Sequence, residues 1–168
     1  MEIRKLYRWT LFMALLTVLA GCQSDKSLVG GYLNLDTDLR MEFIVEADIN
    51  PDEQGVGSPL FLRMYQLKAT SMIDKADFID LYEQDKKALG ADLVGEVYRL
   101  NRFKPGENRA EQFVLDQSTK FIALYGEFLD FKDSKFKLVI PVVTNNVFKN
   151  SAVIRISGNE IRLNDANN

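Results

Sequence analysis

Apolar and polar side chains alternate through LRMEFIVEADI, residues 39–49, with Ile44 as the one exception. A period of two places the apolar side chains on a single face, so the pattern predicts a half-buried β-strand. The turn-forming segment NPDEQGVGSP, residues 50–59, follows and ends this strand. The next segment, LFLRMYQL at residues 60–67, is apolar on both faces, which indicates a strand in the centre of a sheet.

Short segments of the same kind fill most of the remaining chain. LVGEVYRL (93–100) and RAEQFVL (109–115) predict two strands that pair across the turn NRFKPGEN. Three later segments predict the last strands, and they are residues 120–131, 135–143 and 152–164. Roughly seven or eight short strands with one inserted helix indicate a mainly β fold, an antiparallel β-sandwich in one domain.

The inserted helix is predicted from DKADFIDLYEQDKKALG, residues 74–90, whose apolar positions follow a helical period. Asp74 is a suitable N-cap, and Gly90 stands where a helix would end. Four side chains are expected on the buried side, and they are Phe78, Leu81, Tyr82 and Leu89. Four acids are expected on the solvated side, and they are Asp77, Asp80, Glu83 and Asp85.

The first 21 residues have the layout of a secretory signal peptide. Arg4, Lys5 and Arg8 precede WTLFMALLTVLA, an uncharged run of 12 residues. A helix that spans a bilayer takes about 20 such residues, so the run is too short. Its end, Leu19-Ala20-Gly21-Cys22, resembles the bacterial lipobox, in which the cysteine receives lipid and the peptide before it is cleaved. An uncleaved anchor and a chance cysteine in an ordinary signal peptide are the alternatives.

These features divide the chain into three predicted parts. They are a cleaved signal peptide at residues 1–21, a lipidated N-terminus and tether at residues 22–38, and a β-sandwich domain at residues 39–168. The tether is polar and contains Gly30-Gly31, and about 16 flexible residues would average roughly 22 Å. The acyl chains on Cys22 are the expected anchor, because each buried methylene contributes about 0.8 kcal/mol.

The residues that the chain lacks exclude several classes of function. It has no histidine, and Cys22 is its only cysteine, so Ser-His-Asp, Cys-His and ordinary zinc sites are excluded. From Cys22 onward there are 18 basic and 23 acidic residues, a net charge of −5 without a basic patch, which argues against nucleic acid binding. We expect a protein that is not an enzyme, without cofactor, metal or small-molecule substrate. A hydrolase that uses carboxylates alone is a minor alternative.

Three motifs follow the lipobox in a fixed order, and they are INPDEQGVGSPLFLRMYQLK, ADFIDLYEQDKKALGADLV and RFKPGE. With this set the chain resembles the TssJ family (also called SciN or VasD), the outer-membrane lipoproteins of type VI secretion systems. The resemblance is dense over residues 39–106 and thinner afterwards, where Phe136-Lys137 stands in place of the Trp-Arg pair typical of the family. It implies a transthyretin-like β-sandwich with added helical elements, held by lipid on the periplasmic face of the outer membrane.

The resemblance also implies a partner, the periplasmic C-terminal domain of the inner-membrane protein TssM, which works with TssL. The family's principal contact with TssM is the loop between the first two strands. Carried onto this sequence, the loop consists of Asn50, Pro51, Asp52, Glu53, Gln54, Gly55, Val56, Gly57, Ser58 and Pro59.

Two further considerations concern location and alternatives. Gln23, directly after the lipidated cysteine, is not the aspartate that favours retention in the inner membrane, which agrees with export to the outer membrane. The loop could instead be an ordinary exposed hairpin loop. The whole protein could instead be a lipoprotein carrier or pilot that binds an apolar ligand or escorts an envelope protein.

Overall fold

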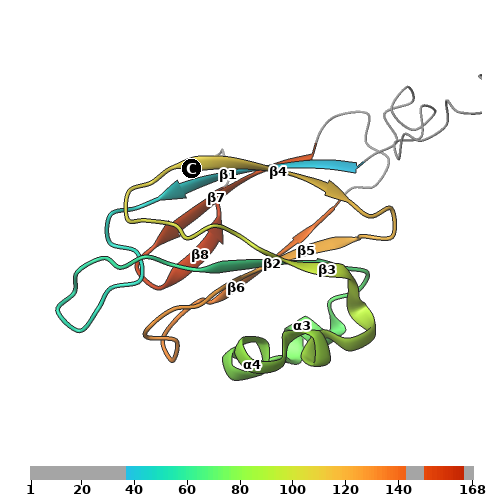
Figure 1. Ribbon diagram of the computed structural model, residues 1–168, viewed down its shortest axis with the longest axis horizontal. Coiled ribbons are helices and arrows are strands. Elements are labelled where there is room, and N and C mark those ends of the chain that lie inside the picture. Colours follow the sequence, from blue (N-terminus) through green and yellow to red (C-terminus); the bar gives the residue numbers. More distant parts are fainter. Residues whose placement is uncertain (1–36, 143–149, 165–168) are drawn as a thin grey trace, which may run out of the picture. The chain divides into compact units, whose positions relative to one another are not determined.

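The computed structural model describes residues 37–142 and 150–164, which form two four-stranded sheets with helices on one side (Figure 1). In chain order the elements are β1 (Thr37–Val45), β2 (Leu62–Leu67), α3 (Ser71–Lys75), α4 (Phe78–Leu89), the short 3-10 helix η1 (Gly90–Asp92), β3 (Leu93–Arg99), β4 (Arg109–Leu115), β5 (Phe121–Gly126), β6 (Lys137–Pro141), β7 (Asn150–Ser157) and β8 (Glu160–Leu163). The sheet orders are β4-β1-β7-β8, called here the first sheet, and β3-β2-β5-β6, the second sheet. The predicted mainly β sandwich is confirmed, and one pair within it, β1 with β7, is parallel.

The main core lies between the two sheets. The alternation predicted for β1 is confirmed, because Leu39, Met41, Phe43 and Val45 are all buried in this core. Burial of one face of a strand in this way contributes about 1.5–3 kcal/mol for each large apolar side chain. The alternation therefore fixes which face of β1 turns inward.

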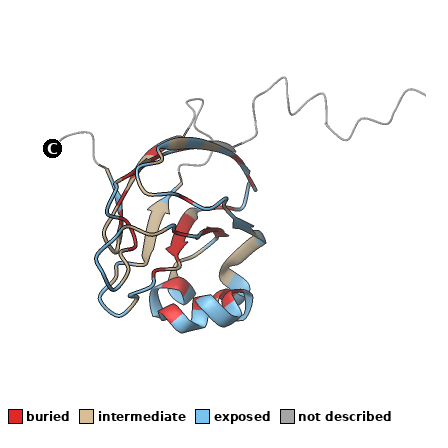
Figure 2. Cartoon of the chain, turned by 60° about the vertical axis from the view of Figure 1, so that its left-hand side comes forward, coloured by how far each residue is buried: buried red, intermediate tan, exposed pale blue. Residues whose placement is uncertain are grey.

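The second sheet is covered on both faces, as the sequence of its central strand predicts. Every residue of β2 is buried. Leu62 and Met64 belong to the main core, whereas Tyr65 and Leu67 pack in a second apolar cluster beneath the helices. Figure 2 shows the helices against this sheet, with exposed residues on their outer side.

The helical segment begins differently from the prediction. Asp74 is not an N-cap but lies inside α3, and the backbone is extended at Ala76 (ψ 130°) before α4 begins. Asp77 caps α4 instead. Its Oδ1 accepts from the backbone N of Asp80 at 2.8 Å, and the Oδ2 of Asp80 accepts from the backbone N of Asp77 at 3.2 Å. The predicted end at Gly90 is confirmed, with φ +47° at the C-cap.

The predicted burial of α4 is confirmed in part. Phe78, Leu81 and Leu89 are buried, but Tyr82 is 52% exposed. Asp85, predicted to be solvated, is buried, because it pairs with a buried arginine of the sheet below.

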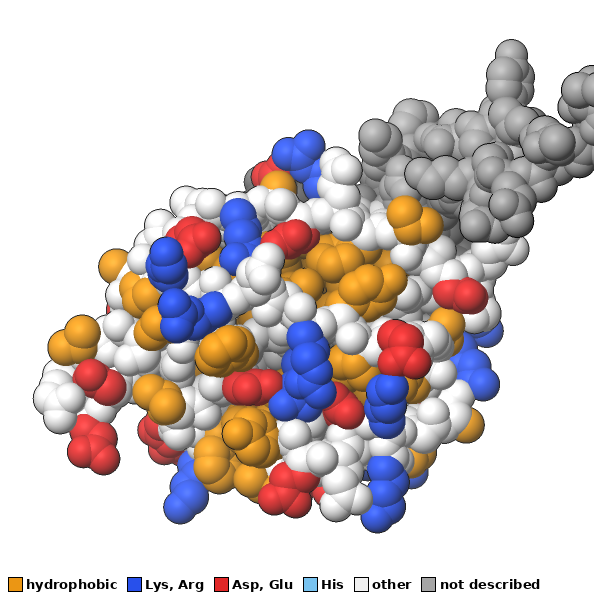
Figure 3. All heavy atoms as spheres, viewed as in Figure 1, with side chains coloured by type: hydrophobic (Ala, Val, Ile, Leu, Met, Phe, Trp, Pro, Cys, Tyr) orange, Lys and Arg blue, Asp and Glu red, His pale blue; other side chains and the backbone are white. Residues whose placement is uncertain are grey.

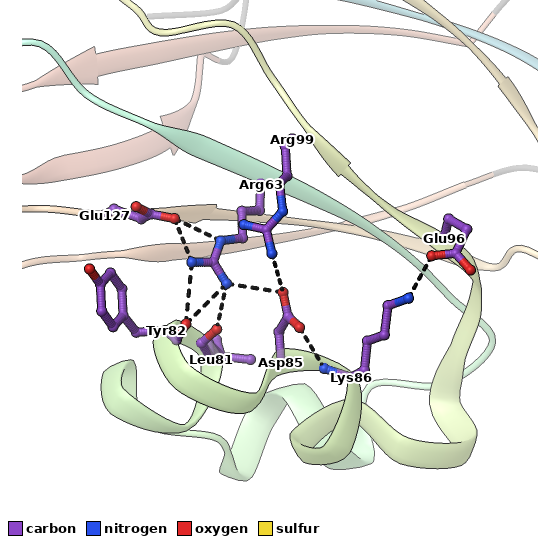
Figure 4. Close-up of polar contacts among 8 residues, drawn as sticks. All are labelled: Arg63, Leu81, Tyr82, Asp85, Lys86, Glu96, Arg99 and Glu127. Carbon is purple, nitrogen blue, oxygen red and sulfur yellow. Dashed lines mark hydrogen bonds and ion pairs between the residues drawn. The ribbon is translucent and has the colours of Figure 1, made fainter.

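Arg63 of β2 is that arginine, and it joins the second sheet to α4 (Figure 4). The helix departs from helical geometry at Gln84 (φ −141°, ψ 45°), which frees backbone carbonyls in the preceding turn. The Nη1 of Arg63 donates to the carbonyl of Leu81 at 2.9 Å and to Asp85 Oδ2 at 3.0 Å. Its Nε donates to Glu127 Oε1 at 2.7 Å, so the buried guanidinium is paired with two carboxylates.

Lys137 of β6 holds α3 in a similar way. Its Nζ donates to the carbonyls of Ile73, Asp74 and Ala76, at 2.7, 3.1 and 2.9 Å. These carbonyls stand at the C-terminal end of α3, where they have no partner within the helix. Burial lowers the pKa of Lys137, against the opposing effect of the carboxylates of Asp74 and Asp77.

The predicted pairing of residues 93–100 with residues 109–115 is wrong. These segments form β3 and β4, which lie in different sheets, and residues 100–108 cross from one sheet to the other. The backbones of Leu60 and Phe103 exchange two hydrogen bonds of 2.9 Å. Phe103 is fully buried, with its ring 4.8 Å from that of Phe43. Burial of this aromatic ring makes the crossing favourable, which a turn-rich sequence does not reveal.

Candidate partner-binding site

Residues 50–59 form a short hairpin that projects from one end of the sandwich (Figure 1). The backbone of Pro51 pairs with that of Gly57. At the tip, the N of Gly55 donates to Asp52 O and the N of Asp52 donates to Val56 O, both at 2.9 Å. Gly55 has φ +77°, so the tip has the pattern of a β-turn followed by a left-handed glycine.

The side chain of Asp52 stabilises this turn from inside. Its Oδ1 accepts hydrogen bonds from the backbone N of Gln54 and of Val56, both at 2.9 Å. Aspartate commonly forms such bonds to the backbone two residues on. The carboxylate of Asp52 is therefore engaged within the hairpin, and Glu53, which is exposed, is the acid at the tip that a partner can reach.

Asn50 holds the base of the hairpin. It is the only non-glycine residue with positive φ (+46°) in the described part of the chain, and it is only 2% exposed. Its Nδ2 donates to Pro59 O at 3.0 Å, and its Oδ1 accepts from the N of Leu129 at 2.7 Å. Its backbone N donates to Gly158 O at 2.8 Å. Asn50 thus ties the hairpin to the segment after β5 and to the β7–β8 turn.

Gly57 is required where the hairpin passes close to the end of β1. A Cβ at this position would lie 2.2 Å from the carbonyl oxygen of Ala47. Real Cβ atoms do not approach backbone this closely, so any other residue would displace the hairpin. The loop is therefore fixed by both its tip and its base, and it presents Val56, which is 61% exposed, in an ordered setting.

The ten predicted residues thus fall into two groups. Those exposed to solvent are Glu53, Gln54, Gly55, Val56 and Pro59. Those wholly or partly buried are Asn50, Pro51, Asp52, Gly57 and Ser58. Cys22 and tether residues 23–36 lie outside the described residues, so lipidation and the predicted domain boundaries stay predictions. The last two residues of the predicted tether, Thr37 and Asp38, begin β1.

The hairpin and the point at which the chain enters the sandwich lie at opposite ends of β1. The strand begins at Thr37 and ends at Val45, shortly before the hairpin. Nine residues of β-strand extend about 30 Å at roughly 3.3 Å per residue. The hairpin therefore lies about one strand length from Thr37.

Three exposed apolar side chains outside the hairpin were not predicted from the sequence. They are Phe61, Leu129 and Tyr82, which are 50%, 61% and 52% exposed. All three belong to segments predicted as a strand or a helix, residues 60–67, 74–90 and 120–131, so their exposure was not predicted. The sequence did contain a signal for the ion pairs of Arg63. Arg63 is a lone charge in an apolar strand, which predicts buried acidic partners.

Three buried ionisable groups of the second sheet, Arg63, Tyr65 and Tyr125, have shifted pKa values. Burial disfavours the charged form of Arg63, but hydrogen bonds and attraction from Glu127 and Asp85 outweigh it, and the pKa of Arg63 is raised. Burial raises the pKa of Tyr65 and of Tyr125, so both phenols stay neutral. Arg63 therefore stays charged and the two phenols stay neutral at physiological pH.

The described cavities do not favour a carrier for an apolar ligand. A cavity of about 60 Å³ opens between the sheets beside Leu39, Met41 and Ile140, whereas ligand pockets hold about 300–1,000 Å³. A groove of about 290 Å³ between α3 and α4 is widely open and is lined partly by Lys75 and Lys87. Among residues 37–142 and 150–164, no group of three side chains could hold a metal ion, and no helix is long and apolar enough to cross a membrane.

Comparison with known proteins identifies relatives of the whole sandwich. Residues 37–159 match the family described as type VI secretion lipoprotein, VasD, EvfM, TssJ. The curated proteins compared with the chain include no match. The fold resembles the type VI secretion lipoprotein TssJ1 from Pseudomonas aeruginosa, with a TM-score of 0.71 and 25% identity over 77% of this chain and 95% of that chain.

Two further solved structures contain a similar chain. One is described as a type VI membrane complex, with a TM-score of 0.63 and 25% identity over 77% of this chain and 98% of that chain. The other is described as the TssM C-terminal domain from EAEC, with a TM-score of 0.62 and 23% identity over 77% of this chain and 98% of that chain. At 23% identity, the similarity to this last chain shows a shared fold.

Proposed function

The chain belongs to the type VI secretion lipoprotein family, and we propose that it tethers the periplasmic C-terminal domain of TssM to the outer membrane. The observation that carries the proposal is the hairpin of residues 50–59. It is ordered by its own hydrogen bonds and exposes Glu53 and Val56 at the end of the sandwich away from Thr37. A rigid, projecting loop binds at a lower entropic cost than a mobile one.

The mechanism is mechanical coupling without chemistry. Acyl chains on Cys22 hold the protein at the periplasmic face of the outer membrane, and two or three such chains make the attachment lasting. The tether leads into β1, and β1 leads to the hairpin, so the covalent backbone of β1 carries a pull from TssM. The hydrogen bonds of β1 with β4 and β7 hold that strand in the sheet. TssL joins the complex through TssM. No step requires a cofactor or a metal.

The relatives support this choice of partner. A chain with this fold occurs in a structure described as a type VI membrane complex and in one described as the TssM C-terminal domain. The acid at the hairpin tip, Glu53, offers charge to a basic face, and Val56 offers an apolar group for a pocket. A small number of side chains near the centre of an interface usually carries most of the binding energy.

The test removes the exposed side chains and keeps the hairpin. The double variant Glu53→Ala/Val56→Ser retains Asp52, Gly55 and Gly57, which form the turn. We expect the full-length lipoprotein with this change to lose co-purification with the TssM periplasmic domain. Val114→Ser is the matched control, because Val114 is equally exposed, at 61%, and lies on β4. Undiminished co-purification of the double variant would remove the hairpin from the proposed function.

A further inference from the structure

We infer that Asn50 is a positioning residue for the bound partner: it sets the direction in which the hairpin presents Glu53 and Val56, and through that direction it sets the affinity. This inference rests on the proposed function, because it concerns the same hairpin and the same partner. Asn50 is buried, with 2% of the residue exposed, whereas Val56 is 61% exposed. A buried amide does not contact a bound protein, so its effect on binding passes through the hairpin.

The hydrogen bonds within the hairpin hold its two limbs together. The backbone of Pro51 pairs with that of Gly57, and the N of Ser58 donates to the carbonyl of Ile49 at 2.9 Å. An isolated two-stranded hairpin is at best marginally stable in water. These bonds also leave the direction of the hairpin relative to the sheets undetermined, so that direction depends on contacts at its base. In Figure 3 the hairpin projects at the left of the molecule, with acidic and hydrophobic side chains on its surface.

Three hydrogen bonds that fix this direction meet at Asn50. Its Oδ1 accepts from the N of Leu129, in the segment after β5 of the second sheet, at 2.7 Å. Its backbone N donates to the carbonyl of Gly158, in the turn between β7 and β8 of the first sheet, at 2.8 Å. Its Nδ2 donates to the carbonyl of Pro59, in the returning limb of the hairpin, at 3.0 Å. One residue therefore joins the two limbs of the hairpin to both sheets.

The residue type suits this position for two separate reasons. The backbone of Asn50 has φ +46°, a left-handed conformation that asparagine and aspartate tolerate better than other residues with a side chain. Its amide in addition supplies an acceptor and a donor, and both are used here. Glycine would keep the conformation and lose both bonds, whereas aspartate would keep the conformation and the acceptor and lose the donor. The two substitutions therefore loosen the base of the hairpin to different degrees.

A loosened hairpin should bind the partner less tightly even though its contact side chains are unchanged. Binding would then have to order the hairpin as well as bury Glu53 and Val56, and that ordering lowers the affinity. In the wild type the bonds of Asn50 already order the hairpin in the free protein. The affinity for the partner therefore depends on a residue that the partner does not touch.

Gln66 offers a matched control near the other end of β2. It is also a buried amide, 4% exposed, and its Oε1 accepts from the N of Asp116 at 2.8 Å and from the hydroxyl of Thr119 at 2.7 Å. β2 begins at Leu62, three residues after the hairpin, and Gln66 stands next to its last residue. Gln66→Ala leaves two hydrogen-bonding groups without their partner, as Asn50→Gly does, so it should lower stability by a similar amount without changing the hairpin.

The experiment measures Kd between the full-length lipoprotein in detergent and the purified TssM periplasmic domain. We expect Asn50→Gly to raise Kd about tenfold and Asn50→Asp by a smaller factor, whereas Gln66→Ala stays at the wild-type value. Circular dichroism and urea unfolding establish that each variant is folded and how stable it is. Amide hydrogen exchange in the free protein should be faster at Asp52 and Ser58 in Asn50→Gly than in Gln66→Ala. If Asn50→Gly does not fold, Asn50→Asp provides the same comparison with Gln66→Ala.

The hairpin variant Glu53→Ala/Val56→Ser is measured alongside and separates the two proposals. If it loses binding while both Asn50 variants bind like wild type, the inference about Asn50 is overturned and the proposed function stands. An equal rise in Kd for Asn50→Gly and Gln66→Ala would also overturn the inference, because a general loss of stability would then explain it. If the hairpin variant binds like wild type, the hairpin is not the contact and both proposals fail.

Discussion

Asn50 and Leu129 are 79 residues apart in the chain and are joined by a hydrogen bond of 2.7 Å between the Asn50 side chain and the Leu129 backbone N. This bond fixes the base of the hairpin to the segment after β5. The order of the hairpin therefore depends on a buried amide as well as on its own turn.

Two substitutions of Asn50 test the role of its side chain and the role of its backbone conformation separately. Glycine adopts φ +46° freely but lacks the amide, so Asn50→Gly leaves the Leu129 N and the Pro59 O without their partner. We expect a loss of about 1–3 kcal/mol in the free energy of unfolding, the usual cost of buried groups left unpaired. Asn50→Ala adds backbone strain and should lose more. Urea unfolding measures both, and equal stability of wild type and Asn50→Gly would contradict the assigned role.

The hydrogen bond between Asn50 and Leu129 also shows where sequence reasoning stops. Local patterns predicted β1 and its buried face, the central position of β2 and the end of α4, because each depends on residues close in the chain. The β3–β4 pairing was predicted wrongly, since the turn formers in residues 101–108 fit a crossing between sheets as well as a hairpin. Only the burial of Phe103 against Phe43 distinguishes the two.

The same limit applies to the site. The hairpin was predicted from its turn formers together with the family resemblance, but not the engagement of Asp52 within the turn. The exposure of Phe61, Tyr82 and Leu129 was not predicted either, because all three lie in segments whose patterns predict strands or a helix. Asp77 with Asp80 is a capping signal that could have been read in the sequence.

Arg63 tests how strongly the buried ion network holds α4. Arg63→Met leaves Glu127 without its counterion, leaves Asp85 with only the more distant Arg99 at 3.9 Å, and frees the carbonyl of Leu81. Loss of one partner from a buried ion pair costs about 3–5 kcal/mol of unfolding free energy. Arg63→Lys keeps the charge but loses the planar guanidinium group. Its free energy of unfolding should lie between those of wild type and Arg63→Met.

The control for Arg63 is another arginine in an ion pair. Arg40 pairs with Glu42 at 2.8 Å, and both side chains are about half exposed (50% and 51%). Exposed pairs contribute less than about 1 kcal/mol, so Arg40→Met should change the urea midpoint little. If Arg63→Met and Arg40→Met cost the same, the network is not what holds α4 on the sheet.

Asp92 should contribute stability that depends on pH. Its carboxylate accepts from the Ser71 hydroxyl at 2.7 Å and from the Met72 N at 3.0 Å, and these bonds lower the pKa of Asp92. A carboxyl with a lowered folded-state pKa stabilises the fold above its unfolded pKa of about 3.9, and the gain disappears as pH falls through the folded value. Asp92→Asn should therefore be less stable than wild type at pH 7.

The difference between Asp92→Asn and wild type should shrink from pH 7 to pH 2, because the Asp92 carboxyl loses its charge as pH falls through its lowered pKa. Urea unfolding at the two pH values measures this difference directly. Ser71→Ala removes the largest contribution to the lowered pKa, so the Asp92 carboxyl should titrate at higher pH in carbon-detected NMR. A difference between Asp92→Asn and wild type that does not change from pH 7 to pH 2 would show that charge is not its cause.

Cys22→Ser separates anchoring from binding. Without the thiol that receives the lipid, the protein should move from the membrane fraction to the soluble periplasmic fraction, because acyl burial at about 0.8 kcal/mol per methylene is lost. Its affinity for the TssM periplasmic domain in solution should equal that of wild type, since the hairpin is unchanged. Secretion should nevertheless stop, because a partner gripped by an untethered sandwich is not coupled to the membrane. Normal secretion by Cys22→Ser would show that the lipid anchor is dispensable, and mass spectrometry of the wild-type N-terminus would then decide whether Cys22 is acylated at all.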